Sequence, residues 1–365
     1  MDALAELRKR DVGSLTWALA ALVGLGTFAL GLIGLPGRRR SYDERVTIRT
    51  ATESVSAIWH AARRTEAPHL AYYLMMKPWL AAFGVGNVAA RFPSVVAAGL
   101  AALFLTVLGT VLFDRLAGVV AGVVLGTASF TMQFAQWARG YTLALLFVVL
   151  ASLAFVRAVA HPRVGWALAW AVAVVVACWI NLFAISIVFV HFAAYALVRP
   201  RPRPRLAGAA LILVVAAVTP IVVLVATADN GQLNWIPEPT ARRVLLHAWD
   251  WSSRNPLLLV AAALGVVTLV RAAAAAPAKR WRAVLVVGWT LAPFVLTLAL
   301  SLAQPAFDAH YLLTGAAGLA LLVGAGVYSL PTRYGLALFG LVAAVGALQL
   351  AHYYVAPGRP FSSLF

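Results

Sequence analysis

Continuous apolar segments of about 20 residues recur along the whole chain, and they constrain its fold more than any other feature. A helix of about 20 residues crosses a hydrocarbon core of about 30 Å. The segments are continuous and do not alternate with polar residues, which excludes a porin-like barrel. With 63% hydrophobic residues and a mean hydropathy of +0.89, the 365 residues leave too little polar surface for a soluble fold. The sequence therefore predicts an all-α, multi-pass integral membrane protein.

We expect about eleven membrane-spanning helices. The predicted spans are Val12–Leu35, Val88–Phe113, Leu116–Ala135, Tyr141–Val159, Val164–Trp179, Leu182–Val198, Leu206–Ala226, Pro256–Val270, Ala283–Leu302, Leu312–Leu330 and Gly335–Tyr354. Arg8, Lys9 and Arg10 precede the first span, and basic flanking residues favour the cytoplasmic side of a membrane. We therefore expect a cytoplasmic N-terminus in the cell membrane, and the first span is too long for the core of a cleaved signal peptide.

Charged residues are scarce, at 11% of the chain, so their placement is informative. In the expected topology, eight of the 12 acids and about half of the 29 Lys and Arg residues fall in outward segments. The positive-inside rule disfavours arginine there. This distribution predicts an anionic partner on the outer face, such as a lipid phosphate. The alternative for any single arginine is that its side chain only extends to the lipid headgroups and binds no specific partner. The alternating Arg and Pro residues of segment 199–205 predict a stiff cytoplasmic connector.

Two outward segments are long enough to hold structure of their own, residues 36–85 and 227–255. In the first, apolar residues recur at a helical period over Arg49–Arg64, which predicts an amphipathic helix on the membrane surface. An interfacial helix is expected over Leu70–Phe83. The second segment contains Gly231 and two prolines around Trp235, which predicts a shaped loop. We expect residues 1–365 to form one transmembrane domain without a separate soluble domain.

A resemblance to a known family rests on short motifs that follow one another from about residue 41 to residue 325. The motifs are Asp43-Glu44, Glu66-Ala-Pro-His69, Ala90-Arg91-Phe92-Pro93-Ser94, Gln136-Trp137-Ala138-Arg139-Gly140-Tyr141, Gln232 to Pro237, and Phe307-Asp-Ala-His310-Tyr311. In this order and spacing they resemble the GT-C superfamily of membrane glycosyltransferases. The resemblance is to the bacterial branch of protein O-mannosyltransferases and the lipid A aminoarabinose transferase, glycosyltransferase families 39 and 83.

The resemblance implies an inverting transferase that moves a mannose- or arabinose-type sugar from a polyprenyl-phosphate donor. The acceptor hydroxyl or amine would belong to a glycan, lipid or protein on the outer face of the cytoplasmic membrane. Membrane lipids are expected partners and nucleic acid is not. The oligomeric state is left open, and so is a divalent metal ion, because no residue cluster has a clear ligand spacing.

The resemblance also implies roles for individual residues. Asp43 is the expected general base, because an acceptor hydroxyl becomes a good nucleophile when a positioned base removes its proton. Glu44 and Glu66 are the accompanying acids, and Glu44 is expected to brace the loop, since neighbouring side chains on extended backbone point apart. Arg139 is the main candidate for binding the donor phosphate through its guanidinium fork. The further candidates for the phosphate or lipid are His69, Lys77, Arg91, His310 and Tyr311, and those for the substrate wall are Tyr72, Tyr73, Gln136, Tyr141, Gln232 and Trp235.

Three positions depart from the pattern of the family. Trp137 stands where the family often has an acid, His310 where it often has arginine, and Lys77 where it commonly has histidine. Of these departures, Trp137 and His310 leave open a catalytically inactive relative that acts as an assembly partner. A transporter or flippase of a lipid-linked sugar or another anion is a further alternative. The spans contain few ionisable residues and the halves show no repeat, so the transferase is favoured.

Overall fold

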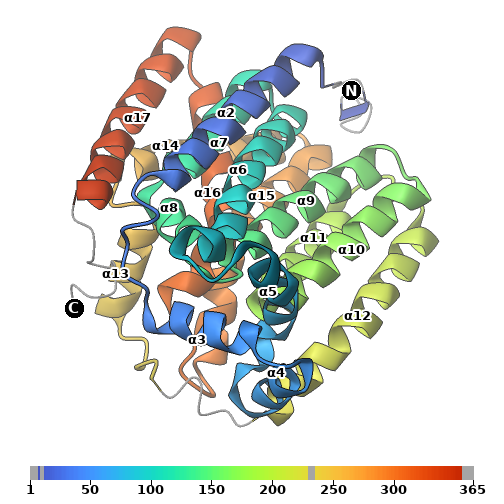
Figure 1. The fold of residues 1–365 in the computed structure, drawn as a ribbon. Coiled ribbons are helices and arrows are strands. Elements are labelled where there is room, and N and C mark those ends of the chain that lie inside the picture. The colour runs from blue at the N-terminus through green and yellow to red at the C-terminus, as the bar shows by residue number, and fades with distance from the viewer. Residues whose placement is uncertain (1–6, 9–11, 229–234, 356–365) are drawn as a thin grey trace.

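The computed structural model describes residues 7–8, 12–228 and 235–355. Every regular element in these residues is a helix, and the helices form one bundle (Figure 1). The expected all-α fold of a multi-pass membrane protein is therefore confirmed.

Eight helices in the described residues are long and apolar enough to cross a membrane. Six are single helices, namely α2 (Ser14–Leu32), α6 (Asn87–Leu112), α9 (Tyr141–Ala160), α12 (Pro204–Thr227), α14 (Pro256–Ala275) and α17 (Thr332–Val355). The other two join a 3-10 turn to a helix, namely η5 (Pro277–Lys279) with α15 (Arg280–Leu300), and η6 (Ala309–Gly315) with α16 (Ala316–Tyr328). The shorter apolar helices are α10 (Val164–Ile180) and α11 (Ser186–Leu197), the latter preceded by η3 (Leu182–Ile185). Each of the eleven predicted spans corresponds to one of these elements or to the bent pair described next.

The predicted span Leu116–Ala135 is bent in the structure. It consists of α7 (Arg115–Thr127) and α8 (Ser129–Ala135), which meet at 59° and would add a ninth span if counted as one. Ala128 between them has extended backbone, with φ −61° and ψ 123°. The hydroxyl of Thr127 donates to the carbonyl of Val123, a bond that favours helix bending. The bend brings the chain after α8 to the end of the bundle where the first outward segment lies.

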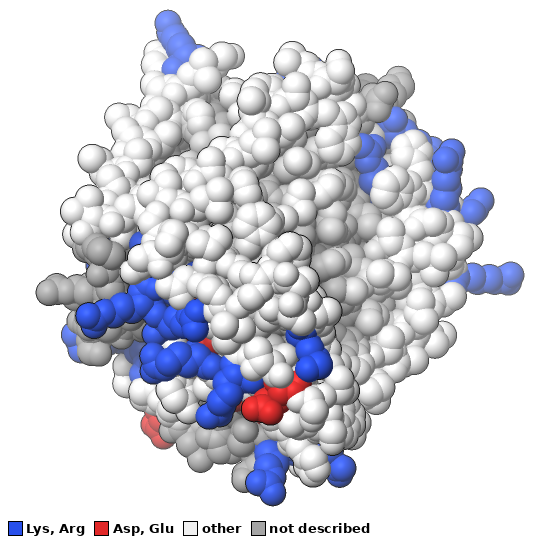
Figure 2. Space-filling view, viewed as in Figure 1, with Lys and Arg blue, Asp and Glu red and all other residues white. Residues whose placement is uncertain are grey.

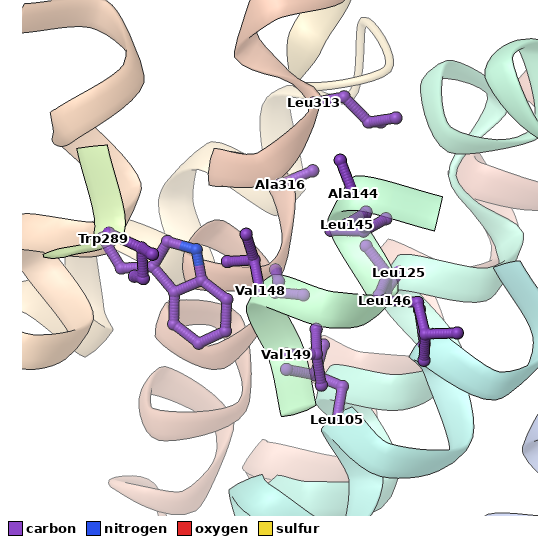
Figure 3. Close-up of a cluster of buried hydrophobic side chains, with 14 of the residues drawn as sticks. Leu105, Leu125, Ala144, Leu145, Leu146, Val148, Val149, Trp289, Leu313 and Ala316 are labelled. Atoms are coloured by element: carbon purple, nitrogen blue, oxygen red, sulfur yellow. The ribbon is translucent and has the colours of Figure 1, made fainter. Parts of the chain in front are cut away.

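Apolar side chains from several helices pack together in one core. Figure 3 shows apolar residues of α9, including Val148 and Val149, clustered with Leu105 of α6 and Trp289 of α15. The indole of Trp289 donates to the carbonyl of Thr314 at 2.8 Å, so its polar atom is satisfied in the core. In a membrane, where lipid tails are as apolar as leucine, such close packing is a main source of helix association.

Residues 36–85, the first segment expected to face outward, contain a chain of short helices. These are α3 (Tyr42–Thr52), α4 (Val55–Ala61), the π-helical turn η1 (Ala62–Glu66), the 3-10 turn η2 (Ala67–His69) and α5 (Leu70–Phe83). The expected helix Leu70–Phe83 is confirmed. The single helix over Arg49–Arg64 is wrong, because the chain breaks after Thr52 and the hydroxyl of Ser54 caps a new helix by accepting from the amide of Ala57. In the second segment, α13 (Ala241–Trp251) lies at the same end of the bundle (Figure 1).

A substitution at Gly265 of α14 tests how closely the helices of the bundle pack. A Cβ atom at this position would overlap the carbonyl oxygen of Leu322 in α16. We expect Gly265→Ala to lower the free energy of unfolding by about 1–3 kcal/mol, as overpacking does in protein cores. The control Gly340→Ala adds the same methyl group to α17, where nothing lies within 4 Å. Thermal unfolding in detergent measures both, and equal stability of the two variants would contradict the packing described here.

Candidate active site

Asp43 and Glu44 lie in the first turn of α3. The hydroxyl of Ser41 accepts from the Glu44 amide at 3.2 Å, and the Glu44 carboxylate accepts from the Ser41 amide at 2.9 Å, which completes a capping box. The backbone here is therefore helical, and the expectation of extended backbone is wrong. On a helix the side chains of neighbouring residues diverge by about 100°, so the two carboxylates still point in different directions.

Glu44 is buried and joined to Arg91 of α6 by a two-pronged ion pair. The Nε and Nη2 atoms of Arg91 lie 2.6 and 3.0 Å from the carboxylate oxygens, and the amide of Ala138 donates to the same carboxylate at 3.1 Å. Arg91 also donates to the carbonyls of Leu35, Arg38 and Arg39. Glu44 thus links α3 to α6 and to residues 136–140.

The prediction that Arg91 binds the donor phosphate does not fit this geometry. A guanidinium group has five N–H donors. In Arg91 they have five acceptor contacts, two with Glu44 and three with backbone carbonyls, and the side chain is 2% exposed. The sequence motif could not show this, because the motif does not say which charged residues pair with one another.

Arg139 lies at the centre of a second charged group. Its Nη2 atom is 3.2 Å from Asp43, and its Nη1 atom is 3.9 Å from Glu66 and 3.0 Å from the hydroxyl of Tyr73. That hydroxyl in turn donates to Glu66. The structure therefore brings together Asp43, Glu66 and Arg139 from three separate motifs, and Tyr73 joins two of them.

Exposure differs sharply within this group. The side chain of Asp43 is 39% exposed, whereas that of Arg139 is 5% exposed. The Nε atom of Arg139 is buried and has no hydrogen-bond acceptor among the described residues. The group thus presents a carboxylate to its surroundings and keeps one buried N–H group of the guanidinium unused.

Burial and neighbouring charges shift the pKa values of Arg139, Tyr73 and His69. Burial opposes the charge on Arg139, but Tyr73, Tyr141, Asp43 and Glu66 together raise its pKa above the usual value. Burial also raises the pKa of Tyr73, so this hydroxyl keeps its proton and donates it to Glu66. Burial, and then the charges of Arg139 and His310, hold the pKa of His69 well below its usual value. His69 is therefore neutral at pH 7, and its Nδ1 atom has no partner among the described residues.

Asp308 and His310 form a third group beside the second. The Nδ1 atom of His310 lies 2.6 Å from Asp308. Burial alone would raise the pKa of Asp308, but the adjacent His310 lowers it to about 2. The His310 ring faces the rings of Tyr141 and Trp235, with centroids 5.1 and 6.0 Å away. The sequence prediction missed Asp308, although its place two residues before His310 in the last motif was a usable signal.

The remaining predicted residues are spread more widely. Tyr311 stacks on Phe183 at 3.8 Å, and Tyr72 is fully buried. Lys77 donates to the carbonyl of Glu53. Trp235 is 59% exposed beside His310. Gln232 lies outside the described residues.

Gln136 does not fit the predicted role in the substrate wall. Its amide nitrogen donates to the carbonyls of Gly31 and Ile33 at 2.9 and 2.8 Å, and its amide oxygen accepts from the hydroxyl of Tyr353. The side chain is 1% exposed. Gln136 therefore links the end of α2 to α17 and leaves no polar atom free for a ligand.

A resident metal ion does not fit these residues well. No cluster of three or more His, Cys, Asp or Glu side chains with a metal-binding arrangement occurs among the described residues. Asp43 and Glu66 both face the guanidinium of Arg139, and Glu44 faces that of Arg91. The carboxylates that could best bind a metal ion are thus already ion-paired with arginines.

Comparison with solved structures identifies the fold. ArnT from Cupriavidus metallidurans bound to undecaprenyl phosphate superposes with a TM-score of 0.62 at 18% identity, over 96% of this chain and 68% of that protein. The apo form of ArnT gives 0.59 at 18% identity, over 89% and 61% of the two chains. The oligosaccharyltransferase of Archaeoglobus fulgidus gives 0.65 at 11% identity, over 94% and 56%. The chain has the GT-C fold.

The GT-C fold agrees with the resemblance found in the motifs, since both solved proteins are GT-C membrane glycosyltransferases. The chain spans about three-fifths of the length of ArnT and a little over half of the oligosaccharyltransferase. No protein-family model matches the chain, and no curated protein matches its sequence.

Glu44→Gln tests the brace. The variant keeps the shape of the side chain but leaves Arg91 as a buried charge without its carboxylate. Breaking a buried pair in this way costs about 3–5 kcal/mol. We expect a clear fall in the unfolding temperature in detergent, whereas the control Glu53→Gln, at the exposed end of α3, should melt like the parent. A Glu44→Gln variant as stable as the control would contradict the role of the pair.

Proposed function

We propose that this chain is an inverting glycosyltransferase that moves a sugar from a polyprenyl-phosphate donor to a hydroxyl or amine of an acceptor. One observation carries the proposal: the half-exposed carboxylate of Asp43 lies 3.2 Å from the buried guanidinium of Arg139. The carboxylate of Asp43 suits proton removal from an acceptor, and the guanidinium of Arg139 suits a phosphate. ArnT, which has the same fold, has been solved with undecaprenyl phosphate bound, and this supports the class of donor.

The proposed reaction assigns one step to each group. The acceptor oxygen or nitrogen forms a bond to the anomeric carbon on the side opposite the phosphate, so the configuration inverts. The acceptor proton passes to Asp43, and the bond from the anomeric carbon to the phosphate oxygen breaks. The electron pair stays on that oxygen, where the charge of Arg139 stabilises it. The unused Nε–H of Arg139 is available to donate to the leaving phosphate.

The other residues of the site support these two. Glu66 and Tyr73 contact Nη1 of Arg139, whereas Asp43 contacts Nη2, and we propose that Glu66 and Tyr73 hold the guanidinium in place. His69 is neutral, and its unpartnered Nδ1 is proposed to contact the phosphate. Tyr141, Trp235 and His310 form an aromatic group that suits a sugar or a lipid tail. We place the reaction on the outer face of the cytoplasmic membrane, with a mannose- or arabinose-type sugar.

Asp43→Asn tests the assignment of the base. The amide cannot accept the acceptor proton, so we expect transfer to fall by about 10²-fold or more. The measurement is the formation of labelled product by the full chain in liposomes from polyprenyl-phosphate mannose or arabinose. Glu53→Gln is the matched control and should keep full activity. An Asp43→Asn variant as active as the parent would exclude this base, and movement of labelled donor across the membrane without product would favour the transporter.

Arg139→Lys tests the assignment of the phosphate ligand. Lysine keeps the positive charge but lacks the planar fork, so it cannot reproduce the separate contacts that the nitrogens of Arg139 make with Asp43 and Tyr73. We expect kcat/KM for the donor to fall on the order of 10²-fold. Arg45→Lys is the control, because Arg45 is an exposed arginine of the same helix as Asp43. Unchanged use of the donor by Arg139→Lys would move the phosphate site elsewhere.

A further inference from the structure

The end of the bundle opposite α3, α4 and α5 carries two adjoining pockets. At this end α9 finishes at Ala160 and α10 begins at Val164, while α11 finishes at Leu197 and α12 begins at Pro204. On the face seen in Figure 2, basic side chains gather at both ends of the bundle and leave an almost uncharged band between them. One of these basic areas, at the upper right, is the end formed by α9, α10 and α12 (Figures 1 and 2).

The first pocket is an apolar cavity of about 220 Å³ between these four helices. Its walls include Phe155, Trp170, Phe192 and Leu211. The polar wall residue His191 is already satisfied, because its Nδ1 accepts from the indole of Trp170 at 2.9 Å and its Nε2 lies 3.1 Å from the hydroxyl of Ser152. The cavity therefore suits an apolar chain and offers no polar group of the core to a ligand.

The second pocket, of about 270 Å³, is basic. Its described lining is Arg8, Ala160, His161, Pro162, Arg163 and Arg203, which includes three arginines and no carboxylate. Arg8 is fixed here, since its Nε donates to the carbonyl of Ala160 at 2.8 Å. Burial, and then the charges of Arg157, Arg163 and Arg8, lower the pKa of His161, which reflects the positive potential of this pocket. An anion is the ligand that such a lining favours.

The two pockets meet at Pro162 and Arg203, which line both. Arg203 has a φ of +42°, a left-handed conformation that costs a residue with a side chain about 1–2 kcal/mol. The preceding segment is held in place, because the hydroxyl of Tyr195 donates to the carbonyl of Pro202 at 2.9 Å and Arg199 donates to that of Ala196 at 2.6 Å. Strained backbone of this kind concentrates at binding sites. Here it places an arginine between the basic and the apolar pocket.

We propose that the adjoining pockets bind one anionic phospholipid, with an acyl chain in the apolar cavity and the phosphate among Arg8, Arg163 and Arg203. The charge of the pocket matches the headgroup, and the apolar cavity beside it matches the tail. The site lies at the end of the bundle away from Asp43 and Arg139, so it is separate from the proposed sugar transfer. A bound lipid would join the ends of α9, α10 and α12.

The headgroup half of the site is tested with the purified full chain in detergent. Lipid binding is measured by native mass spectrometry with phosphatidylglycerol and phosphatidylcholine of identical acyl chains. We expect the parent to prefer phosphatidylglycerol, and Arg163→Gln combined with Arg203→Gln to weaken that binding on the order of tenfold or more. The control Arg271→Gln removes an exposed arginine near the end of α14 and should bind like the parent. Equal phosphatidylglycerol affinity of the parent and the double variant overturns the proposal, as does a parent that binds both lipids equally.

The acyl half of the site is tested by filling the cavity. Gly208 lines the apolar pocket, and a Cβ atom there would meet nothing within 4 Å, so Gly208→Leu adds an apolar side chain at the wall of the cavity without a clash at the Cβ position. We expect it to bind phosphatidylglycerol on the order of tenfold more weakly, while Gly340→Leu, an equally open position in α17, changes nothing. Parent-like binding by Gly208→Leu overturns the proposal. So does displacement of the lipid by an equal concentration of inorganic phosphate, which would show that only the headgroup is bound.

Discussion

The arrangement of the candidate site depends on the buried ion pair between Glu44 and Arg91. Moving two charges out of water costs several kcal/mol per ion unless each is paired and hydrogen-bonded. Both conditions are met, because Arg91 has five acceptor contacts and Glu44 accepts from Arg91, Ser41 and Ala138. The pair thus fixes α3 against α6 and against the segment that leads into α9. Arg139 follows Ala138 directly, so the bond from the Ala138 amide to Glu44 also sets where Arg139 begins.

The apolar surroundings explain why irregular backbone is found beside this pair. In a hydrocarbon environment every unpaired backbone group is costly, so a break in a helix needs polar partners inside the protein. The bend between α7 and α8 is followed by Gln136, whose amide satisfies the carbonyls of Gly31 and Ile33 near the end of α2. Gln136 therefore matters for the site without lying in it. It ties residues 136–140, which carry Arg139 to Asp43, to the end of α2.

The sequence predicted the apolar helices and the helix Leu70–Phe83 because hydrophobic period and length are local properties of a chain. It also predicted that Asp43, Glu66 and Arg139 belong together, although only through the order of the motifs. It could not predict that Arg91 pairs with Glu44, since nothing in the local sequence separates an arginine that binds a ligand from one that neutralises a carboxylate. The break after Thr52 was missed for a related reason. The apolar period continues past Glu53 and Ser54, although α3 ends at Thr52 and the hydroxyl of Ser54 caps the start of α4.

The excess of positive charge in residues 36–85 explains why this segment contains so many arginines. Within the central group Arg139 faces two carboxylates, so the net charge of the group does not attract an anionic donor from a distance. Residues 36–85 as a whole contain more cations than anions, namely Arg38, Arg39, Arg40, Arg45, Arg49, Arg63, Arg64 and Lys77 against Asp43, Glu44, Glu53 and Glu66. Several of the arginines are exposed, and Figure 2 shows a basic surface at this end of the bundle with acidic groups inside it. Such a surface attracts an anionic lipid at long range, whereas the buried Arg139 acts only at contact. In the proposed reaction, the exposed arginines would therefore capture the donor, and Arg139 would stabilise the leaving phosphate.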